Sequence, residues 1–136
     1  MATYNKFQCF VKDICEKKHN LGSDTLKVAL SNASNAPSAS ADVKLADITT
    51  VSVTNLDSVT LTVSSSSQTS GTYKLVVADL TMTASGAVGP FQYVIIYNDT
   101  ASNKELICWY DYGSEVTLAS GDTFKLDFGT ELFSLA

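Results

Sequence analysis

The spacing of apolar residues changes near residue 25, and this change limits the folds available to the chain. Between Tyr4 and Lys18 the apolar side chains recur every three or four residues, as on one face of a helix. From Thr25 onward they alternate with polar residues, and short polar clusters separate the alternating stretches. The sequence therefore predicts one short amphipathic N-terminal helix followed by a mainly β body.

The predicted helix carries a single apolar stripe and has signals at both ends. Thr3 can cap its N-terminus, and Gly22 can end the segment by adopting a positive φ. The stripe either packs against a sheet as part of the core or helps to dock the domain on a partner. It consists of Tyr4, Phe7, Phe10, Val11 and Ile14, of which Tyr4, Phe7 and Val11 are candidate interaction residues.

The rest of the chain is typical of strands and turns. Residues 26–30 alternate and are predicted to be half buried, whereas residues 91–98 are apolar almost throughout, as in a strand covered on both faces. The small polar residues of 31–42 and 64–71 predict two exposed loops. Further strands are expected at 50–54, 58–64, 72–83 (with a break near residues 78–79), 105–112, 116–118, 124–128 and 132–135.

Closely spaced strands with turn signals between them predict an antiparallel β-sandwich or a jelly-roll-like barrel. A chain of 136 residues is long enough for one domain with its own core. We expect a single domain, 1–136, in which residues 1–22 form the helix and its cap and residues 23–136 form the β body.

Composition argues against two classes of partner. All nine basic residues are lysines, and without arginine the bidentate contacts typical of nucleic-acid recognition are missing. The first residues do not resemble a secretory signal, and the longest apolar runs are too short to span a bilayer. We therefore expect no nucleic-acid partner and no membrane partner. Folding in a reducing cytoplasm would leave Cys9, Cys15 and Cys108 as free, buried or half-buried thiols.

Side chains that could carry out catalysis or bind a metal are sparse. His19 is the only histidine, and its position at the end of the predicted helix favours a structural role. The sequence contains no nucleophile elbow, phosphate-binding glycine loop or calcium-binding loop motif, and most aspartates lie beside turn residues. We therefore expect no enzymatic activity, no cofactor and no metal site.

One group of aromatic residues has the potential to bind a partner. It comprises Tyr93, Tyr97, Trp109, Tyr110 and Tyr112. Such residues form cross-strand pairs in cores, dominate protein interfaces, and provide the flat platforms of sugar-binding modules. All three interpretations remain open from the sequence, with Trp109, Tyr110 and Tyr112 as the candidate interaction residues.

Several turn and strand-edge segments are similar to those of a known family. They are residues 19–28 (HNLGSDTLKV), 68–79 (QTSGTYKLVVAD), 84–86 (ASG), 88–91 (VGPF), 97–100 (YNDT) and 109–114 (WYDYGS). These segments resemble small structural proteins encoded in the morphogenesis regions of tailed bacteriophages, and the similarity extends from the helix to the last strand. Residues 32–42 and 55–58 depart from it, because they are shorter and less rich in glycine.

The resemblance implies a virion component, most like a capsid decoration (cement) protein that binds and stabilises the outer surface of the assembled head. It implies the phage major capsid protein as partner, a homo-oligomer (dimer or trimer), and synthesis in the cytoplasm of the host bacterium. It implies no catalytic residue. Two alternatives stay open: a structural protein of the tail or baseplate, and a carbohydrate-binding module that uses Trp109, Tyr110 and Tyr112.

Overall fold

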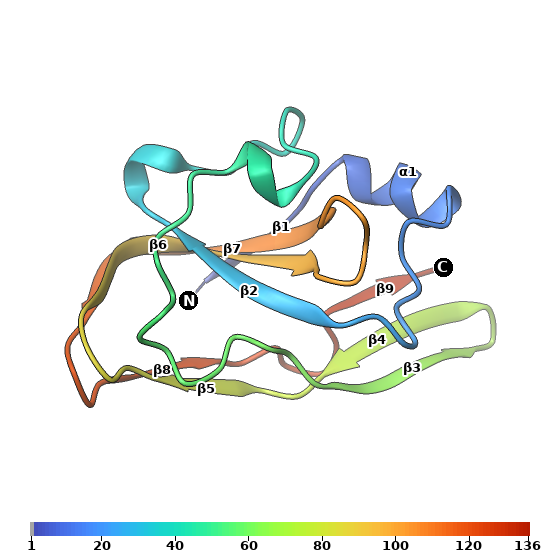
Figure 1. Cartoon of the computed structure of the whole chain (residues 1–136). Helices are drawn as coiled ribbons and strands as arrows, with labels where there is room; N and C mark the ends of the chain where they lie inside the picture. Colours follow the sequence, from blue (N-terminus) through green and yellow to red (C-terminus); the bar gives the residue numbers. More distant parts are fainter. Residues whose placement is uncertain (1) are drawn as a thin grey trace.

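The computed structural model describes residues 2–136 and is mainly β, with one short α-helix, as the sequence predicts (Figure 1). The elements in chain order are β1 (Thr3–Lys6), α1 (Cys9–Cys15), β2 (Leu26–Ser31), the 3-10 turns η1 (Ala33–Asn35) and η2 (Leu45–Asp47), β3 (Val63–Thr69), β4 (Thr72–Val77), β5 (Leu80–Thr83), β6 (Val88–Asn98), β7 (Leu106–Leu118), β8 (Thr123–Leu126) and β9 (Phe133–Leu135).

The strands form two antiparallel layers. One layer is a four-stranded sheet with the order β1-β7-β6-β2. The other contains the two-stranded sheet β5-β8 and the three-stranded sheet β3-β4-β9. In this layer β5 continues the path of β4, and β9 continues that of β8 (Figure 1). The break predicted near residues 78–79 separates β4 from β5. This arrangement confirms the predicted sandwich-like fold, although the sheets do not close into a barrel.

Backbone hydrogen bonds link the two layers beside β2. The amide of Val28 donates to the carbonyl of Val59 (2.8 Å), and the amide of Leu61 donates to that of Leu26 (2.9 Å). The segment that begins beside β2 then runs into β3 in the other layer. Among the described residues, β1 pairs only with β7 and β8 only with β5. The side between β1 and β8 is therefore open, and we call it the seam.

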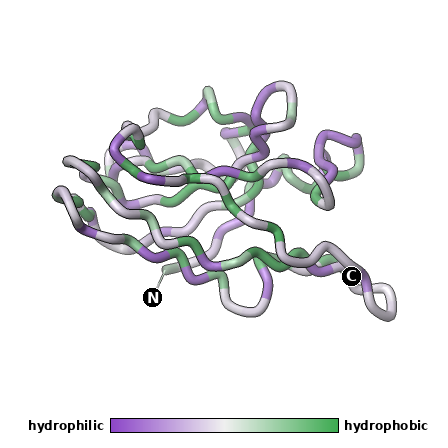
Figure 2. The backbone as a smooth tube through the Cα atoms, turned by 60° about the horizontal axis from the view of Figure 1, so that its bottom comes forward, coloured by the Kyte–Doolittle hydropathy of each residue, from purple (hydrophilic) through white to green (hydrophobic). Residues whose placement is uncertain are grey.

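The main core fills the space between the layers. Its largest fully buried side chains include Phe91, Leu75, Met82, Leu26 and Ile96, which come from both layers. Hydrophobic stretches accordingly follow the strands, while several loops are hydrophilic (Figure 2). Burying one such side chain stabilises the fold by about 1.5–3 kcal/mol.

A second, smaller core lies on the outer face of the four-stranded sheet. It contains Phe7, Ile95, Tyr97 and Trp109, and it is covered by Ile48 with partly buried neighbours from the segment 32–50. That segment lies above the sheet in Figure 1 (cyan to green). The polar stretch 31–42 is therefore not simply an exposed loop, because Ser31 and Pro37 are buried. The same cover makes β2 almost wholly buried, where half burial was expected.

The helix predicted over Tyr4 to Lys18 is shorter than expected. Residues Thr3–Lys6 form β1 and pair with Cys108–Asp111 of β7, so Tyr4 belongs to a strand. The helix has Gln8, not Thr3, at its N-cap. Pairing along the free edge of β7 satisfies the backbone groups of Thr3 and Asn5, and this tertiary contact outweighs the local helical pattern.

The end of α1 is formed by Lys17 and not by Gly22. Lys17 has φ = 65°, whereas Gly22 is not among the residues with positive φ. The amide of Lys18 donates to the carbonyl of Asp13 (2.9 Å), and the amide of Lys17 donates to that of Ile14 (3.3 Å). These two bonds form a Schellman motif, in which the residue with positive φ is usually glycine.

The polar stretch 64–71 forms a strand and not the second loop that was expected. Residues 64–69 belong to β3, which pairs with β4 from Thr69↔Thr72 back to Val63↔Val77. Ser70 and Gly71 both have positive φ (52° and 83°), as in a two-residue type I′ hairpin turn. The favourable turn and the pairing with apolar β4 thus order a sequence that carries no hydrophobic pattern of its own.

The remaining differences concern strand ends. Residues 50–54 and 58–62 are extended but contribute only isolated bridges at Val51 and Thr60. The strands β6 and β7 are longer than predicted, since β7 continues through Gly113 to Leu118. Gly113 (φ = 93°) lies in an irregular part of the β6–β7 ladder, so it marks a bulge and not a strand end.

The strained end of α1 gives a stability prediction. Replacing Lys17 with glycine should raise the free energy of unfolding by about 1 kcal/mol, because glycine adopts positive φ without a Cβ penalty. Chemical denaturation of Lys17→Gly against the parent chain measures the difference. Lys18→Gly is the matched control and should not stabilise, because Lys18 does not have a positive φ. Equal effects of the two substitutions would contradict this account of the helix end.

Candidate functional site

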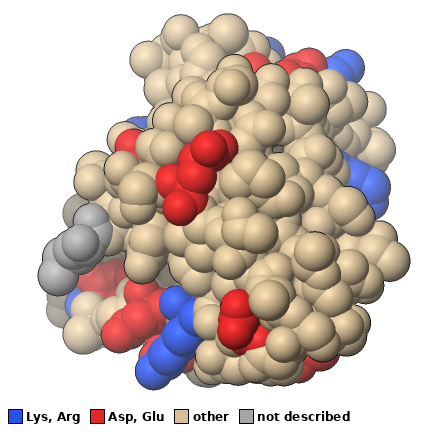
Figure 3. Space-filling view, turned by 90° about the vertical axis from the view of Figure 1, so that its left-hand side faces the viewer, with Lys and Arg blue, Asp and Glu red and all other residues tan. Residues whose placement is uncertain are grey.

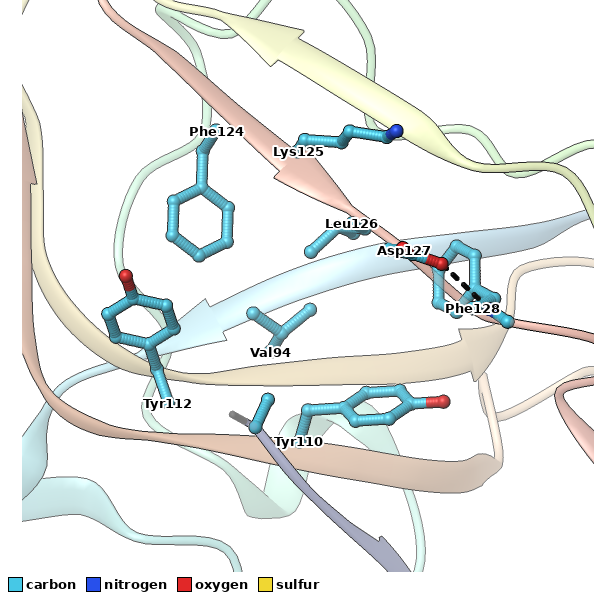
Figure 4. Close-up of a pocket in the computed structure, with 10 residues that line it drawn as sticks. Val94, Tyr110, Tyr112, Phe124, Lys125, Leu126, Asp127 and Phe128 are labelled. Atoms are coloured by element: carbon cyan, nitrogen blue, oxygen red, sulfur yellow. Dashed lines mark hydrogen bonds between the residues drawn. The ribbon is translucent and has the colours of Figure 1, made fainter.

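An apolar groove of about 510 Å³ opens at the seam, and its walls come from β7 and β8 (Figure 4). Tyr110 and Tyr112 of β7 form one wall, Phe124 and Leu126 of β8 form the other, and Val94 of β6 lies between them. Ala2, Lys125, Asp127, Phe128 and Gly129 complete the lining. We call this the seam groove. Its volume lies in the range of small-molecule and peptide-side-chain pockets.

The rings that line the seam groove are held by edge-to-face and tilted contacts. Tyr112 and Phe124 point toward each other from the two walls, with ring centroids 5.4 Å apart (Figure 4). Tyr110 packs against Phe128 at 6.1 Å, and Tyr4 of β1 packs on the other side of Tyr110 at 5.5 Å. Such pairs contribute roughly 0.5–1.5 kcal/mol beyond the area that they bury. The groove therefore has stiff walls and one well-exposed ring, Tyr112, which is 47% exposed.

The candidate aromatic group does not form one platform. Trp109 lies on the opposite face of the sheet from Tyr110 and Tyr112, where its ring packs 4.5 Å from that of Phe7. Tyr93 and Tyr97 belong to the same outer cluster. Because side chains alternate between the two faces of a strand, the sequence WYDY already separates Trp109 from the two tyrosines. Core packing is thus the role of Trp109, one of the three interpretations that the sequence left open.

The candidate interaction residues therefore fall into buried and exposed sets. Phe7 and Trp109 are buried against each other, so neither presents a surface to a partner. Tyr4 is partly exposed at the edge of the four-stranded sheet, and Val11 is 50% exposed on the outer side of α1. Tyr110 and Tyr112 line the seam groove. The sequence did not single out Phe124 and Phe128, and only the pairing of β8 with β5 places them opposite the tyrosines.

Unpaired backbone groups flank the seam groove. The amide of Phe7 donates to the carbonyl of Ile107 (3.2 Å). In an antiparallel ladder, residues bonded to the partner strand alternate with residues whose backbone groups point away from it. The backbone groups of Tyr4 and Lys6 therefore point away from β7. On the other wall, the amide of Ala84 donates to the carbonyl of Asp122 (2.9 Å). The same alternation turns the backbone groups of Thr123 and Lys125 away from β5. Both edges of the seam can accept an additional strand.

Charge near the seam groove is sparse and balanced. The Lys125 ammonium lies 3.4 Å from a carboxylate oxygen of Asp79, and Asp127 accepts a hydrogen bond from the amide of Gly129 (2.9 Å). The face of the molecule in Figure 3 is likewise mostly uncharged, with a few acidic groups and lysines. An exposed pair such as Lys125–Asp79 contributes about 1 kcal/mol or less. Binding in the seam groove would therefore depend on apolar contact and backbone pairing.

The only histidine belongs to a different part of the fold. His19 lies after α1, where its Nδ1 is 3.0 Å from the side-chain amide nitrogen of Asn98 and its ring packs 5.2 Å from Phe10. Burial lowers the pKa of His19 below its usual 6.5. Within residues 2–136, no group of three or more His, Cys, Asp or Glu side chains is arranged to hold a metal ion. No helix of that part of the chain is long and apolar enough to cross a membrane.

The three cysteines are free thiols in different environments. Cys108 is fully buried in the main core, and Cys9 is half buried with a pKa raised to about 11 by burial and by the nearby Asp13 carboxylate. Cys15 is exposed, contrary to the expectation of a buried or half-buried thiol, because it lies on the outer side of α1. The separation of Cys9 and Cys15 agrees with the expectation that they do not bridge.

No family model, curated protein or solved structure matches the chain. The phage resemblance noted from the sequence segments therefore stays a prediction.

The thiol environments predict three reaction rates. At pH 8 an excess of a disulfide reagent such as DTNB should modify Cys15 first, Cys9 more slowly because little of it is thiolate, and Cys108 only on unfolding. The absorbance of the released thiolate measures each phase. Cys15→Ser should remove the fast phase alone. A chain in which all three thiols react at the same rate would contradict the buried position of Cys108.

Proposed function

We propose that this chain is a non-enzymatic structural protein of a tailed-bacteriophage virion, and specifically a decoration protein that binds the outside of the assembled head. The proposal is supported by the segments that resemble the phage family. Residues 68–79 contain the end of β3, the hairpin turn and β4, residues 97–100 span the end of β6, and residues 109–114 lie in β7 beside the seam groove. The similar segments are thus hairpins and strand ends, which set the shape of the β body.

The observation that carries the binding part of the proposal is the seam groove between two free strand edges. A segment that enters it in an extended conformation could pair with β1 or β8 through its backbone and place every second side chain among Tyr110, Tyr112 and Phe124. We propose an extended segment of the major capsid protein, with apolar residues at alternate positions, as the occupant. The sparse charge of the groove fits such a segment.

Attachment to an assembled shell would stabilise it by mass action. A protein that binds the expanded lattice and not the free coat subunit lowers the free energy of the lattice by an amount set by its affinity and concentration. The stiff, ring-packed walls of the seam groove would keep the ordering cost of binding low. A homodimer or homotrimer would add avidity, because several grooves would then bind neighbouring coat subunits together.

The direct experiment mixes the purified protein with phage heads that lack it. We expect copies bound in fixed proportion to coat subunits and a higher disruption temperature of the heads, measured by sedimentation and calorimetry. Failure to bind any head of the phage that encodes it would overturn the decoration role. A dozen or fewer copies per virion, located by imaging at the tail, would favour the tail or baseplate alternative.

Two substitutions distinguish the seam groove from the helix as the binding surface. Tyr112→Ser should weaken head binding about tenfold or more, because an exposed aromatic ring is a typical interface hot spot. Val11→Ser is the matched control, since Val11 is equally exposed but lies on α1, and it should bind as the parent chain does. The opposite result would place the interface on the helix.

Strand addition at β8 has its own test. Lys125→Pro removes an outward amide without removing a bond to β5, and it should block binding. Lys125→Ala loses the same charge but keeps the amide, so it should bind normally. Gln68→Pro, on the exposed strand β3, controls for a general effect of proline at an edge. Full binding by Lys125→Pro would contradict backbone pairing at Lys125 of β8 and would favour the β1 edge instead.

The ring-lined groove also favours a second candidate, a carbohydrate-binding module. Tyr112, Tyr110 and Phe124 offer apolar ring surface to a sugar, whereas Trp109 is buried and cannot. A glycan array distinguishes the two: retention of a sugar that is lost in Tyr112→Ala, with no binding to heads, would support the module. Absence of any retained glycan at millimolar concentration would remove it.

A further inference from the structure

A cluster of buried polar side chains lies where α1 and the segment after it pack on the end of the four-stranded sheet. Asp13 of α1 is 5% exposed and Glu105, just before β7, is 4% exposed. Asn98, the last residue of β6, is fully buried, and its backbone amide donates to the backbone carbonyl of Glu105 (3.0 Å). Asn98 and Glu105 are therefore cross-strand neighbours, and His19 lies against them.

The hydrogen bonds of Asn98 fix the orientation of its side chain. Its Oδ1 accepts from the amides of Thr100 (3.0 Å) and Ala101 (3.2 Å). Its Nδ2 donates to Oδ2 of Asp24 (2.7 Å) and has a second hydrogen directed toward Nδ1 of His19 (3.0 Å). Reversing the amide would lose all of these bonds, so Nδ2 is the donor to the imidazole.

This orientation determines the protonation state of His19. A ring nitrogen that accepts a hydrogen bond carries no proton, so the neutral ring carries its one proton on Nε2. Nε2 is buried, as are Oδ2 of Asp13 and Oε2 of Glu105, and none of the three has a hydrogen-bond partner among the described residues. The cluster thus holds one buried donor, Nε2–H of His19, and two buried acceptors, none of which is hydrogen-bonded within residues 2–136.

We infer that His19, Asn98 and Asp24 form an acid-sensitive clasp that holds segment 16–25 on the β body and opens when Nδ1 of His19 is protonated. A protonated Nδ1 would direct a hydrogen at the NH2 group of Asn98. The side-chain amide of Asn98 cannot turn to relieve this contact, because Nδ2 donates to Asp24 and Oδ1 accepts from two backbone amides. The ring must then leave its place, and segment 16–25 loses the contact of His19 with Asn98. It keeps the bond of Asp24, whose Oδ2 accepts from both the side chain of Asn98 (2.7 Å) and the backbone amide of Asn20 (2.8 Å).

The surrounding charges oppose this opening but do not prevent it. The acidic groups that act on the ring are Asp13 from α1, Glu105 from the β6–β7 connection and Asp24 from the segment before β2, and each favours the protonated ring. Burial is the larger effect and lowers the pKa of His19 below 6.5. Because the folded pKa lies below the unfolded one, the stability that the neutral ring provides is complete above pH 6.5. It falls as the pH falls from 6.5 toward the folded pKa.

The clasp can be tested on the unmodified chain, because His19 is the only histidine. Long-range proton–nitrogen NMR should show the Nε2–H form at pH 7.5 and a titration midpoint below 6.5, with amide signals of residues 16–25 and 98–105 moving at the same midpoint. An Nδ1–H form, or a midpoint at or above 6.5, would overturn the clasp. The latter result would mean that His19 forms an ion pair with the carboxylates.

Two variants add readouts that a purely structural histidine would not change. Glu105→Gln removes a charge that favours the protonated ring and should move the His19 midpoint to lower pH. In the parent chain the unfolding constant should rise by as much as about tenfold per pH unit between 6.5 and the midpoint, because the unfolded state binds one more proton there. His19→Gln should abolish that part of the rise. An identical pH dependence in the parent and His19→Gln would overturn the proposal.

Discussion

The rest of the structure depends on the need to cover both faces of one apolar sheet. The central strand β6 is buried on both sides over most of its length, so neither face of the sheet can remain in water. One face packs on the second β layer and forms the main core, while the other is covered by the segment 32–50. The covering of the second face explains why a segment of small polar residues is ordered at all, and why Trp109 is not available to a partner.

The seam groove follows from the same constraint. The second layer is bonded to the first beside β2 and covers the four-stranded sheet from that side. Its last strand on the opposite side is β8, which faces β7 without pairing with it. Tyr110, Tyr112 and Phe124 fill this incomplete part with rings but do not close it. Exposed strand edges normally invite unwanted pairing, and proteins protect them with charge, bulges or short strands. Here β1 and β8 are both four residues long, and Gly113 adds a bulge beside them. A short edge of this kind limits non-specific association and still leaves room for one defined partner strand.

The sequence allows prediction of those features that depend on local pattern. Three of these features have a direct counterpart in the structure. They are the change in the spacing of apolar residues near residue 25, the apolar run of β6, and the break at residues 78–79. Other features depend on contacts between distant residues. Tyr4 lies in a strand because β7 offers a free edge, and the serines of β3 are ordered by β4 and by the Ser70–Gly71 turn. For the seam groove, alternation separates Tyr110 and Tyr112 from Trp109, but nothing local brings Phe124 or Phe128 to them. Of the expected site residues on β7, the two tyrosines line the groove and the tryptophan belongs to the outer core.

The clasp and the seam groove are built on separate chains of aromatic contacts. From His19, ring contacts continue through Phe10 and Phe133 to Tyr73, which leads into β9 and β4 of the second layer. In the groove, one chain joins Tyr4, Tyr110 and Phe128, and another joins Tyr112, Phe124 and Phe91. Val94 at the groove and Asn98 at the clasp are four residues apart on β6, about 13 Å along a strand. That strand is fixed on both sides by β2 and β7, so an opening of the clasp would loosen α1 and the end of the second layer while the walls of the groove stay in place. The fold thus permits an acid-dependent change at one end of the sandwich without loss of the surface proposed to bind the shell.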